Sequence, residues 1–380
     1  MSQKFKLERH LPTLLSLWRG GKGESLPLSP AELAKVSSSL LALQRGLTGG
    51  RKLVGASYME RKDYLGAYLL YYWPVSYMQL SFILHGLAAQ EKLRFSCPLR
   101  ILDVGSGPAP ASAAVCDCLP VSELELADSS PQALALAERL FKADFPSVKV
   151  RAEVCDIREY SPPQGSNYDI ILMSHALNEL WAGEADMLER RIELAEKFAR
   201  ALAPDGILLF VEPALQETSR SLLAVRDGLL PRSEGIHIIA PCPADGVPCP
   251  ALCASSQSCH AEISWQAPEP VASLALHAGL DRHSVKMAFC AFSKRDTEPT
   301  GKFRVVSDAM LNKAGRLRYL LCDGKRRIAL SAPKGDSHAK EIGFFSLKRY
   351  DMIELRKPEL RGNGENPAYG VGLETELAIF

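Results

Sequence analysis

The spacing of hydrophobic residues along this chain changes near residue 90. Before that point apolar residues recur at helical spacing, which predicts an N-terminal helical domain over residues 1–92. One helix begins at "SPAELAKV", where Ser29 and Glu32 have the spacing of a capping box. The segment "YLGAYLLYYWPVSYMQLSFILHGL" is apolar on most faces, and we expect a buried pair of helices broken at Pro74.

Over residues 93–300, short apolar runs alternate with helical segments, in "LRILDV", "ELELAD", "VKVRAEV", "YDIILMS" and "GILLFVE". This alternation predicts an α/β fold with a parallel, doubly wound sheet. A strand in "EGIHIIA" and another in "HSVKMAFCAF" flank a cysteine-rich insertion over residues 240–265. We expect residues 301–380 to form a small, basic, β-rich C-terminal module.

Composition limits the classes of protein to which the chain can belong. With 47% hydrophobic and 23% charged residues in 380, the chain has enough apolar residues for a large core. No apolar leader and no membrane-length apolar run occur, so we expect a cytoplasmic monomer that does not enter a membrane. Thiols rather than disulfides are then expected. We assign these cysteines to the core: Cys97, Cys116, Cys118, Cys155 and Cys290.

The net charge of +1 conceals a basic C-terminal segment. Between Lys302 and Lys357 there are fourteen Lys and Arg against six acidic residues. Such a segment suggests a polyanionic partner, although a charge run is more often an ordinary solvated surface.

Candidate ligand residues follow the first three predicted strands. The turn "DVGSGP" after the first strand lets backbone approach a ligand, and Asp128 and Asp156 end the second and third strands. An acid in the position of Asp128 can accept hydrogen bonds from a ribose, and Asp156 could meet an adenine amino group. Pro110 occupies the third glycine position of a dinucleotide motif, which disfavours a dinucleotide.

The ordered set resembles the class I S-adenosylmethionine-dependent methyltransferases, which have a Rossmann-like sheet. The resemblance implies that the first turn wraps the methionine part of the cofactor. The predicted cofactor-binding residues are Asp103, Gly105, Ser106, Gly107, Pro108, Asp128, Ser129, Asp156, Ile157, Ser174, His175 and Asn178.

The segment "SHALNELW" follows the fourth strand, where these enzymes place substrate-handling groups. It contains neither the N-P-P-F/Y-like turn used for base amines, nor the Asp of ribose 2′-O transfer, nor the Cys of cytosine C5 transfer. His175 is a weak candidate for a catalytic base. The alternative is that His175, Asn178 and Glu179 cap and orient the helix beside the cofactor.

The insertion reads "APCPADGVPCPALCASSQSCH". Structural zinc usually shows C-x2-4-C pairs, whereas Cys242, Cys249 and Cys259 are separated by six and nine residues. Cys-Pro steps in an irregular loop favour an iron–sulfur cluster, with zinc and unligated thiols as alternatives. The fourth ligand would be Cys253 or Cys322.

The motifs "ILDVGSGPAPAS", "SHALNELW", "APCPADGVPCP", "SCH" and "LLCDG", with "YLLYYWPVSY" upstream, resemble the rRNA methyltransferase-like family associated with the small ribosomal subunit. The resemblance implies a 4Fe-4S cluster, rRNA contact and subunit maturation. Mapped onto this chain, the metal ligands would be Cys242, Cys249, Cys259 and Cys322. The RNA-binding residues would be Arg316, Arg318, Lys325, Arg326 and Arg327. Ala244, where a histidine often stands, and the extra Cys253 depart from the pattern.

Two functions remain open. The chain is either an rRNA methyltransferase or an rRNA-binding assembly factor that keeps the cofactor and the cluster for structural reasons. The basic segment and the helical N-terminal domain disfavour a small-molecule methyltransferase.

Overall fold

The central sheet of the protein has eight strands, seven of them in one continuous order and the eighth paired to one of these. Its strand order is β3-β2-β1-β4-β5-β8-β6, with β7 paired to β8. The first five strands of the path run parallel, and β8 is antiparallel to both β5 and β6. The bounds are β1 (Leu99–Val104), β2 (Val121–Asp128), β3 (Lys149–Val154), β4 (Tyr168–Ser174), β5 (Leu202–Glu212), β6 (His237–Ala240), β7 (Ala261–Ser264) and β8 (Ser284–Ser293). This is the Rossmann-like class I methyltransferase topology, and the predicted fold class is confirmed.

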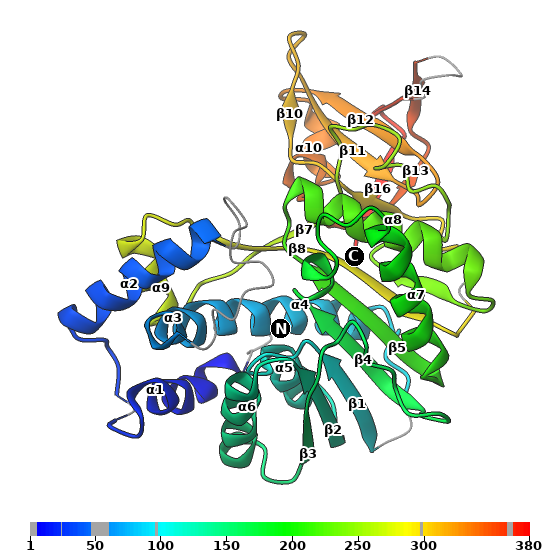
Figure 1. Cartoon of the computed structure of the whole chain (residues 1–380). Coiled ribbons are helices and arrows are strands. Elements are labelled where there is room, and N and C mark those ends of the chain that lie inside the picture. Colours follow the sequence, from blue (N-terminus) through cyan, green and yellow to red (C-terminus); the bar gives the residue numbers. More distant parts are fainter. Residues whose placement is uncertain (1–5, 24, 47–60, 96–97, 297–298, 363–367) are drawn as a thin grey trace.

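The computed structural model (Figure 1) describes residues 6–380 except 24, 47–60, 96–97, 297–298 and 363–367. In these described parts, no helix has both the length and the apolar character needed to cross a membrane.

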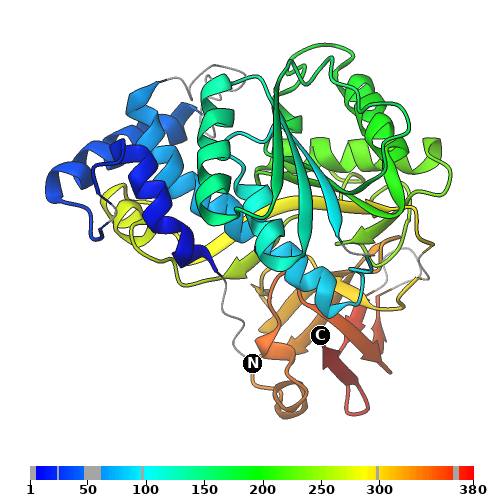
Figure 2. The ribbon, with the colours of Figure 1, turned by 90° about the horizontal axis from the view of Figure 1, so that it is seen from below.

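Helices cover both faces of the sheet (Figure 2). Successive residues of β1 point to opposite sides, so Ile101 packs in the core beneath the N-terminal helices and Leu102 in the core beneath α7 and α8. Both side chains are fully buried. The helices that follow β1 are α5 (Pro110–Cys118), α6 (Pro131–Asp144), α7 (Met187–Arg200), α8 (Gln216–Arg232) and α9 (Val271–His277).

The N-terminal helices are η1 (Leu7–His10), α1 (Leu11–Arg19), α2 (Pro30–Gln44), α3 (Lys62–Ala67), η4 (Tyr68–Tyr72) and α4 (Trp73–Ala89). They contact the sheet domain through α1 on α6, α2 on α9 and α4 on α5. The predicted capping box of α2 is confirmed: the Glu32 amide donates to Ser29 Oγ (3.3 Å), and the Ser29 amide donates to Glu32 Oε2 (2.9 Å).

The predicted break at Pro74 is wrong, because the chain remains helical from α3 to α4. Tyr68–Tyr72 form a π-helical turn in which the Trp73 amide donates to the Tyr68 carbonyl, and Pro74 lies in the first turn of α4. Pro74 has no amide hydrogen to donate to the preceding turn, and the π-helical turn directly before it accommodates the proline within the continuous helix. The continuous helix carries Tyr68 and Gln79 to the sheet domain.

A second sheet forms the C-terminal module, at the top of Figure 1. Its order is β14-β15-β12-β11-β9-β13-β16, with β10 paired to β11. The buried side chains of Tyr319, Leu330 and Phe344 belong to its own hydrophobic core. The elements are β9 (Phe303–Val305), β10 (Met310–Leu311), β11 (Arg316–Cys322), β12 (Arg327–Pro333), α10 (Ser337–Glu341), η6 (Phe344–Ser346), β13 (Met352–Arg356), β14 (Glu359–Arg361), β15 (Ala368–Gly370) and β16 (Glu376–Ile379).

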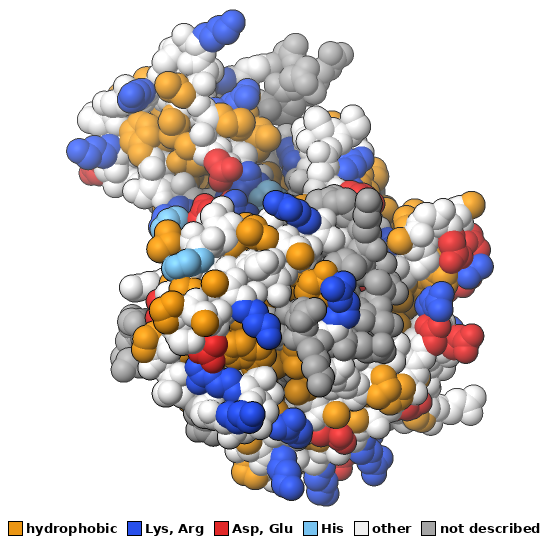
Figure 3. Space-filling view, turned by 60° about the vertical axis from the view of Figure 1, so that its left-hand side comes forward, with side chains coloured by type: hydrophobic (Ala, Val, Ile, Leu, Met, Phe, Trp, Pro, Cys, Tyr) orange, Lys and Arg blue, Asp and Glu red, His pale blue; other side chains and the backbone are white. Residues whose placement is uncertain are grey.

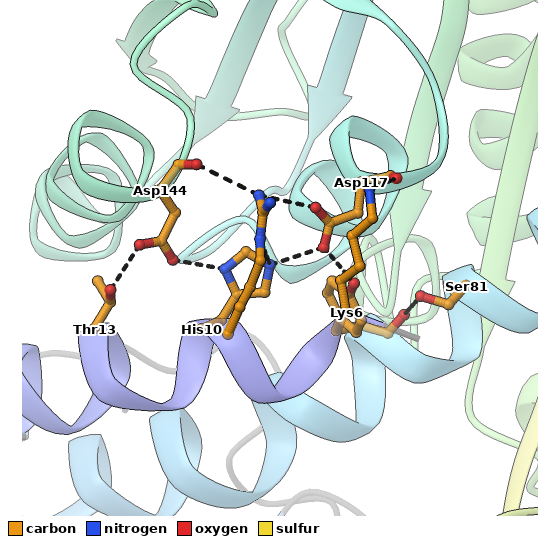
Figure 4. A network of polar contacts seen from close by, with 8 residues as sticks. Lys6, His10, Thr13, Ser81, Asp117 and Asp144 are labelled. Carbon is orange, nitrogen blue, oxygen red and sulfur yellow. Dashed lines mark hydrogen bonds and ion pairs between the residues drawn. The ribbon is translucent and has the colours of Figure 1, made fainter. Parts of the chain in front are cut away.

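His10 joins the N-terminal helices to the sheet domain (Figure 4). The imidazole is fully buried, with Nδ1 2.6 Å from Asp144 Oδ2 and Nε2 2.9 Å from Asp117 Oδ2. Thr13 donates to Asp144 (2.7 Å) and Tyr77 to Asp117 (2.5 Å). Burial alone would lower the pKa of His10, but the hydrogen bonds and charges of the two carboxylates outweigh it and raise the pKa. Because each ring nitrogen lies within hydrogen-bond distance of a carboxylate oxygen, the imidazolium is the form that can donate to both.

This network makes stability depend on pH. Because the pKa of His10 is higher in the folded protein than its unfolded value of about 6.5, its stabilisation is complete below that value and is lost as the pH rises through the folded value. We expect His10→Gln to lower the free energy of unfolding by about 2–4 kcal/mol at low pH, since two charge-assisted hydrogen bonds are weakened. Urea unfolding across a pH series should show the difference shrinking toward alkaline pH. Thr13→Val, which leaves the imidazole in place, is the control; a difference independent of pH would contradict a charged His10.

Candidate functional site

The turn after β1 passes close to the segments that follow β2 and β4. The Gly105 amide donates to the Ala127 carbonyl (2.7 Å), and Gly105 has φ +72°. A Cβ at Gly105 would lie 2.5 Å from the Cβ of Ala176, so a side chain does not fit there. A Cβ at Gly107 would lie 3.4 Å from the hydroxyl of Tyr68, which brings η4 to the same place.

Side chains beneath the turn hold its shape. Asp103 is fully buried and accepts a hydrogen bond from Ser112 Oγ (2.6 Å) in α5, and burial raises the pKa of this carboxyl to about 7. The Pro108 carbonyl accepts from the indole of Trp73 (3.0 Å), and Ser106 is buried in the turn itself. Asp103 therefore supports the turn from below.

Asp128 connects the turns after β1 and β2. Its Oδ2 accepts the Gly107 amide (2.7 Å) and its Oδ1 accepts the Ser130 amide (2.8 Å), while Ser129 is exposed beside it. Burial raises the pKa of Asp128, against the effect of these backbone hydrogen bonds. Each carboxylate oxygen can accept more than one hydrogen bond, so the remaining lone pairs are available to a ligand.

Asp156 and Ile157, the two residues after β3 that were predicted to bind the cofactor, have different surroundings. The Asp156 carboxylate receives two hydrogen bonds from Arg158 Nε (3.0 Å each) and one from Nη2 (2.5 Å), and this contact lowers its pKa. Ile157 instead reaches the β1 turn, with its Cδ1 3.5 Å from the Cβ position of Gly105. Of the pair, Ile157 is the residue that the structure brings to the turn.

His175 lies at the end of β4 in the left-handed conformation (φ +61°). Its Nε2 is 2.7 Å from Oε1 of Gln79, whose amide nitrogen donates to the Lys286 carbonyl (2.9 Å). This second bond orients the Gln79 amide, so Nε2 of His175 is the donor and Nδ1 has no proton. Burial lowers the pKa of His175 to about 4, and the ring is neutral at pH 7.

The short helix η5 (Leu177–Glu179) follows His175 and is held by Glu212, the last residue of β5. The Asn178 amide donates to Glu212 Oε1 (3.1 Å), and the Asn178 side chain donates to the His175 carbonyl (3.1 Å). Burial raises the pKa of Glu212 to about 8. Ser174 Oγ and Glu212 Oε2 are buried without a hydrogen-bond partner in the described part of the chain.

Sequence reasoning missed Tyr68, Gln79 and Glu212 as parts of this site. For Glu212 the signal was its place at the end of the apolar run "LLFVE", as at the other strand ends. Tyr68 and Gln79 had no such local signal, because they reach the site from an N-terminal helix.

The four cysteines assigned as metal ligands line one pocket between the sheet domain and the C-terminal module. Cys249 is buried and the other three are half-buried; all four thiols have a pKa raised by burial. Cys253 is exposed, is not among the lining residues and has its Sγ 4.0 Å from the Cys249 carbonyl. The residues of the pocket used below are Cys242, Cys249, Cys259, Cys322, Arg226, Arg304 and Arg327.

The insertion touches the C-terminal module directly. A Cβ at Gly246 would collide with the Gly324 carbonyl in the β11–β12 turn, and a Cβ at Gly324 (φ +91°) would lie 2.8 Å from the Ala244 nitrogen. Cys322 ends β11 just before this turn. Backbone contact therefore places Cys322 beside the insertion.

The five residues predicted to bind RNA divide into two groups. Arg318, Lys325 and Arg326 are exposed; Figure 3 shows Lys and Arg side chains projecting from the C-terminal module in its upper part. Arg316 donates to the Ser331 carbonyl (3.0 Å), and Arg327 points into the cysteine pocket.

Of the cysteines assigned to the core, Cys290 is fully buried in β8. The side chains of Cys116, Cys118 and Cys155 are half-buried. Cys97 lies outside the described residues.

Comparison with solved structures finds methyltransferases at low identity. The plantazolicin methyltransferase BpumL in complex with SAH is 13% identical, with 70% of this chain and 98% of that chain covered and a TM-score of 0.37. A SAM-dependent methyltransferase from Leishmania major is 13% identical, with 72% and 85% covered and a TM-score of 0.37. An S-adenosylmethionine-dependent methyltransferase from Clostridium acetobutylicum is 10% identical, with 57% and 91% covered and a TM-score of 0.36.

A search of curated proteins finds no match. The model of one protein family, described as mitochondrial small ribosomal subunit Rsm22, matches residues 63–329, which is more than half of the chain. The chain belongs to the Rsm22 family.

Proposed function

We propose that the protein binds S-adenosylmethionine at the carboxyl edge of β1, β2 and β4 and acts with rRNA in maturation of the small ribosomal subunit. The observation that carries the cofactor proposal is Asp128, whose carboxylate accepts the Gly107 amide and so joins the ribose-binding position to the glycine turn. Ala176, two residues after the end of β4, approaches the same turn. The small-subunit role rests on membership of the Rsm22 family.

The first test concerns Asp128. A hydrogen bond to a buried carboxylate contributes about 1.5–3 kcal/mol, so we expect Asp128→Ala to weaken S-adenosylmethionine binding by about tenfold to a hundredfold. Titration calorimetry measures the affinity. Glu153→Ala, an exposed acid on the edge strand β3, is the matched control and should bind like the unmodified chain. Equal affinity of the Asp128 variant would remove the carboxylate from the site.

The geometry at His175 disfavours this residue as a general base for methyl transfer. A general base works best with a pKa near the working pH, and His175 has a pKa of about 4 and donates its only ring proton to Gln79. The role of His175 and Asn178 is then to hold η5 beside the cofactor.

The same Asp128→Ala variant separates the two functions in cells. If a variant that has lost the cofactor still supports small-subunit maturation, cofactor binding and methyl transfer are both dispensable for that role. If maturation fails while rRNA binding is retained, the cofactor site is required. Transfer of labelled methyl to immature small subunits by the purified chain would establish an enzyme.

We also propose that the cysteine pocket holds an iron–sulfur cluster. In the described residues, no three His, Cys, Asp or Glu side chains are grouped so that they could hold a metal ion. A tetrahedral zinc with Zn–S of about 2.3 Å would need its sulfurs about 3.8 Å apart, whereas a cluster contains several irons and bridging sulfides and so separates its cysteines further. The four thiols that line one pocket support a group that binds all four. When bound, such a cluster would supply a fixed link between the insertion and β11.

The second test is the metal content. Protein purified without oxygen should be brown and contain iron and sulfide, and Cys242→Ser, Cys249→Ser, Cys259→Ser and Cys322→Ser should each lose both. Cys253→Ser is the internal control and should keep them, because this thiol is exposed outside the pocket. A colourless preparation with stoichiometric zinc would overturn the cluster.

We further propose that the β11–β12 turn of the C-terminal module contacts rRNA phosphates. Lys325 and Arg326 are exposed in this turn, and Gly324 packs on the insertion beside them. The insertion therefore positions the turn. Because its cations are already held in place before RNA binds, association does not carry the entropic cost of ordering them.

The third test uses the double variant Lys325→Ala with Arg326→Ala. We expect weaker binding to small-subunit rRNA, with the log-log salt slope smaller by about one for each cation that no longer meets a phosphate. Iron content should be unchanged, whereas Cys322→Ser should lose iron and also bind RNA more weakly. Normal affinity of the double variant at several salt concentrations would exclude this turn from the RNA interface.

A further inference from the structure

Three arginines from separate elements line the pocket that the four cysteines share. Arg226 comes from α8, Arg304 from β9 and Arg327 from the start of β12. The side chains of Arg226 and Arg304 are buried, with 1% and 5% of their surface exposed. A buried cation is unfavourable unless nearby groups compensate its charge.

Each arginine is already fixed by hydrogen bonds. Arg226 donates to the Gly246 carbonyl (2.9 Å), and Arg304 donates to the carbonyls of Pro241 (3.1 Å) and Tyr350 (2.6 Å). These contacts hold the backbone of the insertion on both sides of Cys242.

Arg327 is held in the same way at the far end of the insertion. It donates to Gln257 Oε1 (2.8 Å) and to the Ser258 carbonyl (2.8 Å), directly before Cys259. The guanidinium groups are therefore positioned by the protein itself.

Each of the three arginines also has one N–H donor that makes no hydrogen bond. Arg226 Nε, Arg304 Nη2 and Arg327 Nε are buried and have no hydrogen-bond partner among the described residues. The one carboxylate paired with them is Asp227, beside Arg226, in the part of the chain that the structure describes. The pocket thus combines two guanidinium groups without a paired carboxylate, those of Arg304 and Arg327, with unused N–H donors and four thiols. This combination calls for an anionic occupant with several acceptor atoms.

We propose that Arg226, Arg304 and Arg327 donate hydrogen bonds to sulfur atoms of the cluster held by the four cysteines and offset its negative charge. The inference rests on the proposed iron–sulfur site and assigns these arginines as positioning residues that set its reduction potential. Hydrogen bonds to the sulfurs and net charge are the two protein features that tune such potentials. Because Arg226 and Arg304 are buried, they are not available to RNA phosphates.

The experiment compares Arg304→Gln and Arg226→Gln with the unmodified chain, all purified without oxygen. A redox titration followed by visible absorption and electron paramagnetic resonance gives the midpoint potential of the cluster that each protein retains. We expect both Gln variants to shift the potential to more negative values, since removal of a positive charge disfavours the more negative reduced cluster. Arg304→Lys, which keeps the charge, should have a potential close to that of the unmodified chain.

Arg318→Gln is the matched control, because Arg318 is exposed on β11 and lies outside the pocket. It should leave the potential unchanged. Arginines that only hold the loop would reduce the amount of cluster but leave the potential of the remainder unchanged, and that result would overturn the inference. Absence of iron and sulfide from the unmodified chain would instead overturn the proposed cluster, and this inference with it.

Discussion

The hydrogen bonds from Arg226, Arg304 and Arg327 to the insertion are the interactions on which the arrangement of the chain depends. They attach one irregular segment to α8 of the sheet domain and to β9 and β12 of the C-terminal module. Since the module has its own hydrophobic core, this shared segment helps to determine how the module sits on the rest of the protein, together with the contact of Tyr350 with Phe289 of β8. The pocket, the position of Cys322 and the exposure of the β11–β12 turn all follow from it.

The N-terminal helices are part of the cofactor edge as well. The helix that runs through η4 and α4 carries Tyr68 to the glycine turn and Gln79 to His175. The charged network of His10 with Asp117 and Asp144 fixes these helices on α5 and α6. A buried imidazolium between two carboxylates is directional, so it specifies how the helices dock in a way that apolar packing alone does not.

The two candidate centres differ in electrostatics. The edge at β1, β2 and β4 contains carboxyls whose pKa burial raises, such as Asp103 at about 7 and Glu212 at about 8, together with a neutral His175. The cysteine pocket contains buried guanidinium groups. A carboxyl whose pKa is raised toward neutral carries less negative charge, so the cofactor edge is the less charged of the two centres. The guanidinium groups make the cysteine pocket positive, which suits a group with several thiolates.

The sequence by itself determined the features that depend on local chemistry. Apolar periodicity predicts the sheet, glycines and acids mark the strand ends at Gly105 and Asp128, and Ser29 with Glu32 marks the start of α2. Only the tertiary structure decided which side chains meet across long separations in sequence. It kept the helix continuous at Pro74, turned Arg327 inward, placed Cys322 rather than Cys253 in the pocket and brought Gln79 to His175. Each of these outcomes depends on burial and on contacts between distant segments, and neither is encoded in the spacing of neighbouring residues.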